Sequence, residues 1–137
     1  MKRIFETVHP WKVVQTKIDH ADNCPAESVT SLGNGYMGAR GNYEEYYTGT
    51  TLKGTYIAGV WVPDKTRVGW WKNGYPRYFG KVINAPDFLS FDLYLNGQRF
   101  DLAKANLLSF YREVDMKTGL MSRKMDVQTP MGVLTIR

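Results

Sequence analysis

The feature that most constrains this chain is a glycine-rich stretch between residues 27 and 41. It reads Glu-Ser-Val-Thr-Ser-Leu-Gly-Asn-Gly-Tyr-Met-Gly-Ala-Arg-Gly, with glycine at positions 33, 35, 38 and 41. Because glycine has no Cβ, such a backbone can take positive φ angles or let another segment approach closely. The stretch therefore leaves no room for an ordinary helix or a long strand.

The spacing of Gly33, Gly35 and Gly38 also matches a dinucleotide-binding fingerprint. That fingerprint requires a helix that begins at the second glycine and an acidic residue about twenty positions further on, after a second strand. At that distance from Gly38 the chain has Ala58, inside an apolar run. The spacing does not indicate a nucleotide site.

Two interpretations of the glycine-rich stretch stay open. It is either a loop that contacts a substrate or a catalytic domain, or a place where backbone packs tightly on backbone. In the second case we expect Arg40 to pair with Glu27 or Glu44 as an internal clamp. Glycine-rich turns serve folds more often than sites, which favours the packing interpretation.

Charge and cysteine content exclude several classes of partner. The 18 basic and 13 acidic side chains give a net charge of +5. The basic residues are scattered among acidic ones, whereas nucleic-acid binders gather them on one face, so we expect no nucleic-acid partner. Cys24 is the single cysteine, and the sequence contains neither a signal-peptide core nor a membrane-length apolar run. We expect a cytoplasmic protein with no membrane contact.

Strand-forming segments follow one another along most of the chain, and no strong helix is evident. In residues 89–95 apolar and polar side chains alternate, which predicts a strand with one buried face. Asn96-Gly97 then predicts a tight hairpin, since both residues accept positive φ. The length allows one domain. We predict an all-β fold of antiparallel strands, with strands over residues 11–18, 54–62, 89–95, 98–101, 107–114, 120–127 and 133–137.

Catalytic and metal-binding residues are not evident in the sequence. The two histidines, His9 and His20, have no second ligand at metal-binding spacing. No serine or cysteine is accompanied by a placed histidine and acid. Most acidic residues fall at expected turns or strand edges. We therefore expect no catalytic residue, metal ligand or cofactor in this chain.

The aromatic segment 69–80 is the leading candidate for ligand contact. It contains Trp70, Trp71, Tyr75 and Arg77, fits no strand or helix period, and is too aromatic for a simple connection. Sugar rings stack on aromatic side chains, so these four residues are candidate substrate-binding residues. The alternative is that they pack against another domain or subunit, as aromatic residues and arginine also do.

Several motifs occur together and in a fixed order along nearly the whole chain. They are Pro10-Trp11-Lys12-Val13, Glu27 with Gly33-Asn34-Gly35, Gly38 and Arg40-Gly41, the pair Glu44-Glu45, Gly54-Thr55-Tyr56-Ile57-Ala58-Gly59-Val60, Asn84-Ala85-Pro86-Asp87, and Arg112 to Leu120. In this the chain resembles the N-terminal domain of glycoside hydrolase family 65, the inverting disaccharide phosphorylases. It is most similar to the maltose phosphorylase branch.

The resemblance implies that this chain and the catalytic residues belong to different domains. Residues 1–137 would be part of a large β-sandwich N-terminal domain, a supersandwich truncated here, and a following (α/α)₆ barrel would carry the catalysis. In the family, a glutamic acid of that barrel protonates the leaving oxygen of maltose and inorganic phosphate, the co-substrate, attacks the anomeric carbon. The products are β-glucose 1-phosphate and glucose. This chain alone would be inactive.

The implied partners are the protein's own catalytic domain and a second copy in a homodimer. Three alternatives stay open. The chain could be a free-standing carbohydrate-binding β-sandwich that uses Trp70, Trp71 and Tyr75, or a structural domain that never touches sugar. It could also belong to a trehalose or kojibiose phosphorylase, or to a related hydrolase.

Overall fold

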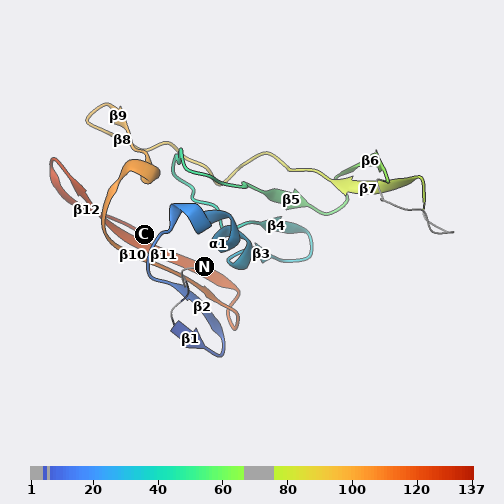
Figure 1. Ribbon diagram of the computed structural model, residues 1–137, viewed down its shortest axis with the longest axis horizontal. Helices are drawn as coiled ribbons and strands as arrows, with labels where there is room; N and C mark the ends of the chain where they lie inside the picture. The colour runs from blue at the N-terminus through green and yellow to red at the C-terminus, as the bar shows by residue number, and fades with distance from the viewer. Residues whose placement is uncertain (1–4, 6, 67–75) are drawn as a thin grey trace.

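Antiparallel strands and the turns between them make up most of the protein. The computed structural model describes residue 5, residues 7–66 and residues 76–137. Three short helices accompany the strands (Figure 1): η1 (His20–Asp22), α1 (Asn23–Val29) and η2 (Leu102–Lys104). The strands are β1 (Thr7–His9), β2 (Lys12–Gln15), β3 (Leu32–Gly33), β4 (Met37–Ala39), β5 (Thr55–Ile57), β6 (Trp61–Lys65), β7 (Tyr78–Val82), β8 (Tyr94–Leu95), β9 (Gln98–Arg99), β10 (Asn106–Asp115), β11 (Leu120–Thr129) and β12 (Gly132–Ile136).

The largest sheet has the order β1-β2-β10-β11-β12. Its centre is the hairpin of the two ten-residue strands β10 and β11, which turn at Gly119 with φ +69°. Strands β3, β4 and β5 form a second sheet, and the pairs β6–β7 and β8–β9 form two ribbons. The predicted all-β antiparallel fold class is confirmed.

The two faces of the five-stranded sheet differ in chemistry. Its outer face carries hydrogen-bonded polar side chains: the Asp126 carboxylate accepts from Ser109 at 2.7 Å and from Thr135 at 2.6 Å. On the same face Lys12 forms an ion pair with Glu113 at 3.1 Å. The inner face is covered by α1, η2 and the loop 42–52, so only one side of this sheet packs.

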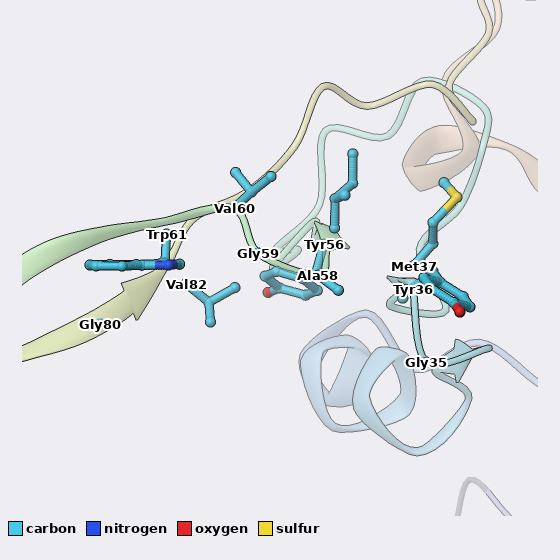
Figure 2. Close-up of a pocket in the computed structure, with 12 residues that line it drawn as sticks. Gly35, Tyr36, Met37, Tyr56, Ala58, Gly59, Val60, Trp61, Gly80 and Val82 are labelled. Carbon is cyan, nitrogen blue, oxygen red and sulfur yellow. The ribbon is translucent and has the colours of Figure 1, made fainter.

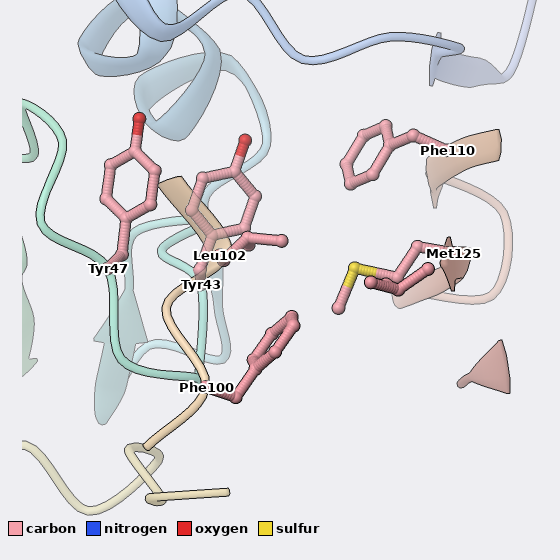
Figure 3. Close-up of a cluster of buried hydrophobic side chains, with 7 residues drawn as sticks. Tyr43, Tyr47, Phe100, Leu102, Phe110 and Met125 are labelled. Atoms are coloured by element: carbon pink, nitrogen blue, oxygen red, sulfur yellow. The ribbon is translucent and has the colours of Figure 1, made fainter. Parts of the chain in front are cut away.

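The core lies under that inner face and is rich in aromatic rings (Figure 3). Tyr43 is its centre, with ring centroids 5.1 Å from Tyr47 and 6.4 Å from Phe110. The latter pair meets edge to face, an arrangement that the ring quadrupole favours. The buried cluster comprises Tyr43, Tyr47, Phe100, Leu102, Phe110, Met125 and Val127.

No strong helix is evident in the sequence, yet Asn23–Val29 forms the seven-residue helix α1. A proline disfavours helical backbone at the residue before it, yet Cys24 lies in α1, with Pro25 in the first turn, where an N–H has no partner to lose. The buried Glu27 side chain holds the helix to the loop 50–52. Intrinsic helix propensity does not include such tertiary contacts, so it gives no sign of this helix. Within the described ranges, no helix has the length and apolar character needed to cross a membrane.

Four predicted strands are also corrected, and the one expected over residues 98–101 is only Gln98–Arg99. Residues 54–62 form two strands rather than one, because Gly59 turns the chain with φ +82° between β5 and β6. Within residues 89–95 only Tyr94–Leu95 is a strand, since the rest runs extended with isolated backbone bonds such as Phe91 N to Glu44 O at 2.8 Å. The first strand is shorter than predicted, at Lys12–Gln15.

The later hairpins match the sequence-based expectation. Asn96 and Gly97 have φ angles of +50° and +76°, as the predicted turn requires. The strands predicted over 107–114, 120–127 and 133–137 lie within β10, β11 and β12, apart from the last residue.

Gly41 sits where backbone packs on the end of α1. A Cβ built on Gly41 would lie 1.9 Å from Thr30 Oγ1 and 2.9 Å from Thr30 O. The Gly41 N–H donates to the Glu27 carbonyl at 2.9 Å. The tight-packing interpretation of the glycine-rich stretch is therefore confirmed at this position. The proposed Arg40 clamp is not, because Arg40 donates to Cys24 O and to Ser28 Oγ instead of to a carboxylate.

We predict that Gly41→Ala destabilises the fold by about 2 kcal/mol or more, because the new methyl group overlaps Thr30 and backbone must move. Gly38→Ala is the matched control in the same stretch: its nearest neighbour would be Leu32 O at 3.7 Å, an ordinary contact. Urea unfolding followed by tryptophan fluorescence measures both. Equal unfolding free energies for the two variants would contradict the packing assignment.

Candidate functional site

Arg112 on β10 is buried to 1% exposure and binds two segments. Its Nε and Nη2 donate to Gln15 Oε1 at 3.0 and 2.6 Å, and its Nη1 donates to the Gly41 carbonyl at 2.6 Å. All of these acceptors are neutral oxygens. Burial lowers the pKa of Arg112, since the charged form has lost water without gaining a carboxylate. Its role in this arrangement is to join β2, β10 and the end of the glycine-rich stretch.

Glu27 is fully buried and is likewise held by neutral groups. Its carboxylate accepts from Asn23 Nδ2 at 2.9 Å, from Thr51 Oγ1 at 2.5 Å and from the Leu52 N–H at 2.9 Å. These bonds fix α1 to the loop after residue 49. The carboxylate has no access to solvent, so it is not placed to act on a substrate.

Arg123 holds the adjacent acids Glu44 and Glu45. Its Nη2 donates to Glu44 Oε2 at 2.6 Å and to Glu45 Oε1 at 2.7 Å. A glycosidase requires two carboxyl groups that face a substrate, whereas one internal guanidinium binds both of these. Among the residues described, no group of three or more His, Cys, Asp and Glu side chains could hold a metal ion.

Tyr43 lies between the two buried guanidinium groups. Its ring centroid is 5.3 Å from Arg112 Cζ and 5.7 Å from Arg123 Cζ, within cation–π range. Burial raises the pKa of Tyr43 to about 12. Its hydroxyl has no hydrogen-bond partner in the part of the chain that the structure describes. The residues Glu27, Tyr43, Glu44, Glu45, Arg112 and Arg123, here called the polar centre, are therefore held by partners within the domain.

We predict that Tyr43→Phe leaves stability at neutral pH unchanged and reduces the loss of stability in alkali. Below pH 10 the phenol is protonated in both states; between pH 10 and about 12 only the unfolded chain releases the proton, so stability falls as pH rises. This contribution is on the order of 2 kcal/mol.

Urea unfolding at pH 7 and across the alkaline range measures the difference, with the exposed Tyr36→Phe as control. If the native protein and Tyr43→Phe lose equal stability between pH 10 and about 12, the assignment is wrong.

An uncovered surface groove lies beside the β3–β4 turn and β5, which Figure 1 shows on the side of the molecule away from β12; Figure 2 shows the residues that line the groove. It has a volume of about 450 Å³ and is formed by the β3–β4 turn, β5 and the near end of the β6–β7 ribbon. Its larger side chains, which define the apolar groove below, are Tyr36, Met37, Tyr56, Ile57, Val60, Trp61 and Val82.

The turn that presents Tyr36 is fixed by its own hydrogen bonds. Asn34 Oδ1 accepts from the N–H groups of Tyr36 at 3.0 Å and Met37 at 2.9 Å, and Gly35 has φ +87°. The Tyr36 carbonyl accepts from Ala58 N at 2.8 Å. The Tyr36 ring is nevertheless 79% exposed, so a rigid backbone presents a side chain that packs on little.

The β6–β7 ribbon has two different faces. Strand register pairs Trp61 with Val82 and Pro63 with Gly80, so these four residues share one face. The Trp61 ring lies over Gly80, where a Cβ would be 3.4 Å from its Cε3. The opposite face carries the Asp64–Lys81 ion pair at 3.5 Å, together with Val62 and Phe79. The ribbon's apolar face is thus continuous with the groove.

The predicted substrate-binding residues are only partly described. Trp70, Trp71 and Tyr75 lie outside the described residues. Arg77 is exposed just before β7, and its carbonyl accepts from Thr66 N at 3.0 Å. It is at the end of the ribbon away from Trp61, so the structure does not bring it into the groove.

Sequence reasoning missed Tyr36, Trp61 and Val82 as neighbours. The place of Tyr36 in the glycine-rich stretch could have indicated an exposed turn. A turn at Gly59 could have indicated that Trp61 begins a separate strand. The pairing of Trp61 with Val82 across 21 positions had no signal in the local sequence pattern.

Comparison with known proteins gives a consistent result. The family model described as "Glycosyl hydrolase family 65, N-terminal domain" matches residues 13–137. A maltose phosphorylase from Bacillus subtilis is 49% identical over 136 residues, which are 99% of this chain and 18% of that protein. An alpha,alpha-trehalose phosphorylase from Thermoanaerobacter brockii is 32% identical over 89% of this chain and 16% of its own length.

A solved structure has the same fold. A putative kojibiose phosphorylase from human microbiome superposes with a TM-score of 0.83 at 25% identity, covering 98% of this chain and 18% of that one. The chain therefore spans less than a fifth of the length of the relatives it matches.

Proposed function

This chain belongs to the N-terminal domain family of the family 65 glycosyl hydrolases, and from that premise we propose that it is the non-catalytic N-terminal part of a disaccharide phosphorylase acting on maltose. The observation that supports maltose is the higher identity to a maltose phosphorylase than to the kojibiose and trehalose phosphorylases. The observation that supports a non-catalytic role is the polar centre, whose carboxylates are bound by internal donors.

The proposed reaction takes place outside residues 1–137, in an (α/α)₆ barrel of the same polypeptide. There a glutamic acid gives its proton to the glycosidic oxygen as the C1–O bond breaks. Inorganic phosphate forms the new C1–O bond from the opposite face, which inverts the configuration. The products are β-glucose 1-phosphate and glucose, with no cofactor.

In this proposal residues 1–137 are a scaffold. They support the barrel and contribute to a homodimer in the cytoplasm. The polar centre suits that role, since Arg112 joins three segments that are far apart in sequence. The basic residues are scattered rather than gathered on one face, which supports the proposal that the protein has no nucleic-acid partner.

The test is an assay of the full-length protein with maltose, trehalose, kojibiose and nigerose, each with and without phosphate. We expect phosphate-dependent release of β-glucose 1-phosphate from maltose. Phosphate-dependent turnover of another sugar alone would reassign the substrate. Cleavage without phosphate would replace the phosphorylase with a hydrolase, and binding of maltose without turnover would favour a carbohydrate-binding module.

We also propose that Trp70, Trp71, Tyr75 and Arg77 contact the disaccharide, since aromatic rings and a cation suit a polyhydroxylated ligand. In the full-length enzyme, Trp70→Ala with Trp71→Ala should then raise the KM for maltose about tenfold, equivalent to about 1.4 kcal/mol. Trp11→Ala, at an exposed tryptophan of the β1–β2 turn, is the control. An unchanged KM with a lower melting temperature would show packing instead of sugar contact.

A further inference from the structure

The apolar groove is a surface that an isolated domain should not expose. Tyr36 is 79%, Trp61 57% and Val82 60% exposed, and the three lie along one continuous strip. Large contiguous apolar patches on soluble domains mark binding surfaces. A two-stranded ribbon such as β6–β7 is also marginal in water until a face is covered. Some structure must therefore cover this strip.

The lining of the groove favours protein over sugar. None of its side chains is charged or carries an amide, and their polar groups are the hydroxyls of Tyr36 and Tyr56 and the indole N–H of Trp61. A sugar site needs several placed polar groups to satisfy the ligand hydroxyls. Rigid aromatic side chains on a dry surface are instead typical of the centre of a protein interface.

The ribbon indicates which side is covered. On the groove side, Trp61, Pro63 and Val82 form an apolar face that ends at Lys65, which pairs with Tyr78 at the far end of the ribbon. On the other side, the Asp64–Lys81 ion pair lies in the middle of the face, where burial would require desolvation of both charges. The outer face of the five-stranded sheet, with its bonded Ser109, Asp126 and Thr135, is likewise suited to water.

More than four fifths of the relatives' own length lies outside the match, so a protein of that length would carry a tethered occupant for the groove. A surface on the same polypeptide has a high effective concentration, so it competes well with a second copy. We propose that the apolar groove and the Trp61 face of the ribbon dock on a segment of the same polypeptide beyond residue 137, with Tyr36, Trp61 and Val82 as the anchors. This proposal rests on the proposed function, because it requires a full-length phosphorylase-like chain.

The first test places one charge on either face of the ribbon in the full-length protein. Val82→Lys puts an ammonium group in the proposed interface; Val62→Lys makes the same change on the opposite face. We expect Val82→Lys to accelerate proteolytic separation of the N-terminal domain about tenfold or more, because a buried unpaired charge opposes docking. Val62→Lys should match the native rate. Equal rates for the two variants would overturn the proposal.

The second test identifies the segment that covers the groove directly, and its result does not depend on the stability of the variant. Val82 or Val62 of the full-length protein is replaced by photoreactive benzoylphenylalanine, and the cross-linked peptides are identified by mass spectrometry. We expect position 82 to link to a peptide beyond residue 137 within one polypeptide, and position 62 to give little product. Links between two copies, no link from position 82, or equal links from both positions would each overturn the proposal.

These readouts separate the docking from the proposed reaction. Intramolecular links from position 82 in a protein that turns over no disaccharide would sustain the interface and reject the phosphorylase. Release of glucose 1-phosphate without those links would support the phosphorylase and reject the interface. Analytical ultracentrifugation of Val82→Lys gives a further check, because a changed number of subunits would assign the groove to an interface between copies.

Discussion

The fold depends on how one guanidinium group is accommodated. Arg112 cannot leave the interior, so it requires Gln15 from β2 and the carbonyl of Gly41. That carbonyl can reach it only where Gly41 lies against Thr30 without a side chain. Thr30 ends α1, whose Glu27 in turn fixes the loop 50–52. Replacing any one of these residues would leave buried polar groups without hydrogen-bond partners. That costs more folding free energy than the loss of one exposed contact.

The residues that carry the family resemblance are therefore mostly structural. Glu27, Gly41 and Arg112 belong to this connected interior, while buried Glu45 and the partly exposed Glu44 are held beside it by Arg123. Asn34 and Gly35 are different, because they shape an exposed turn whose neighbour Tyr36 reaches solvent. One short motif thus serves both the interior of the domain and the rim of its apolar groove. Fold and interface are set by neighbouring positions.

The fold class and the later hairpins could be predicted because their signals are local. Asn96-Gly97 specifies its turn by positive φ, and strand-forming segments separated by turn residues mark β10 to β12. Alternation in residues 89–95 was misleading, since only Tyr94–Leu95 forms a strand there. Helix α1 could not be predicted, because a seven-residue helix is stabilised by tertiary bonds to Glu27 and not by propensity. The apolar groove was also missed, since it depends on the register of β6 with β7 and on the approach of the β3–β4 turn. The neutral partners of Arg112 come from positions 97 and 71 residues away, beyond any pattern of spacing.

The contact of Trp61 with Gly80 has a consequence for how this family can change its sequence. A Cβ at position 80 would touch the indole at 3.4 Å, so a side chain larger than alanine has to point away from the ring or displace it. Bulk at position 80 therefore fits most easily where position 61 carries a smaller residue, which couples substitutions at the two positions. Covariation between these two positions among homologues would record that coupling.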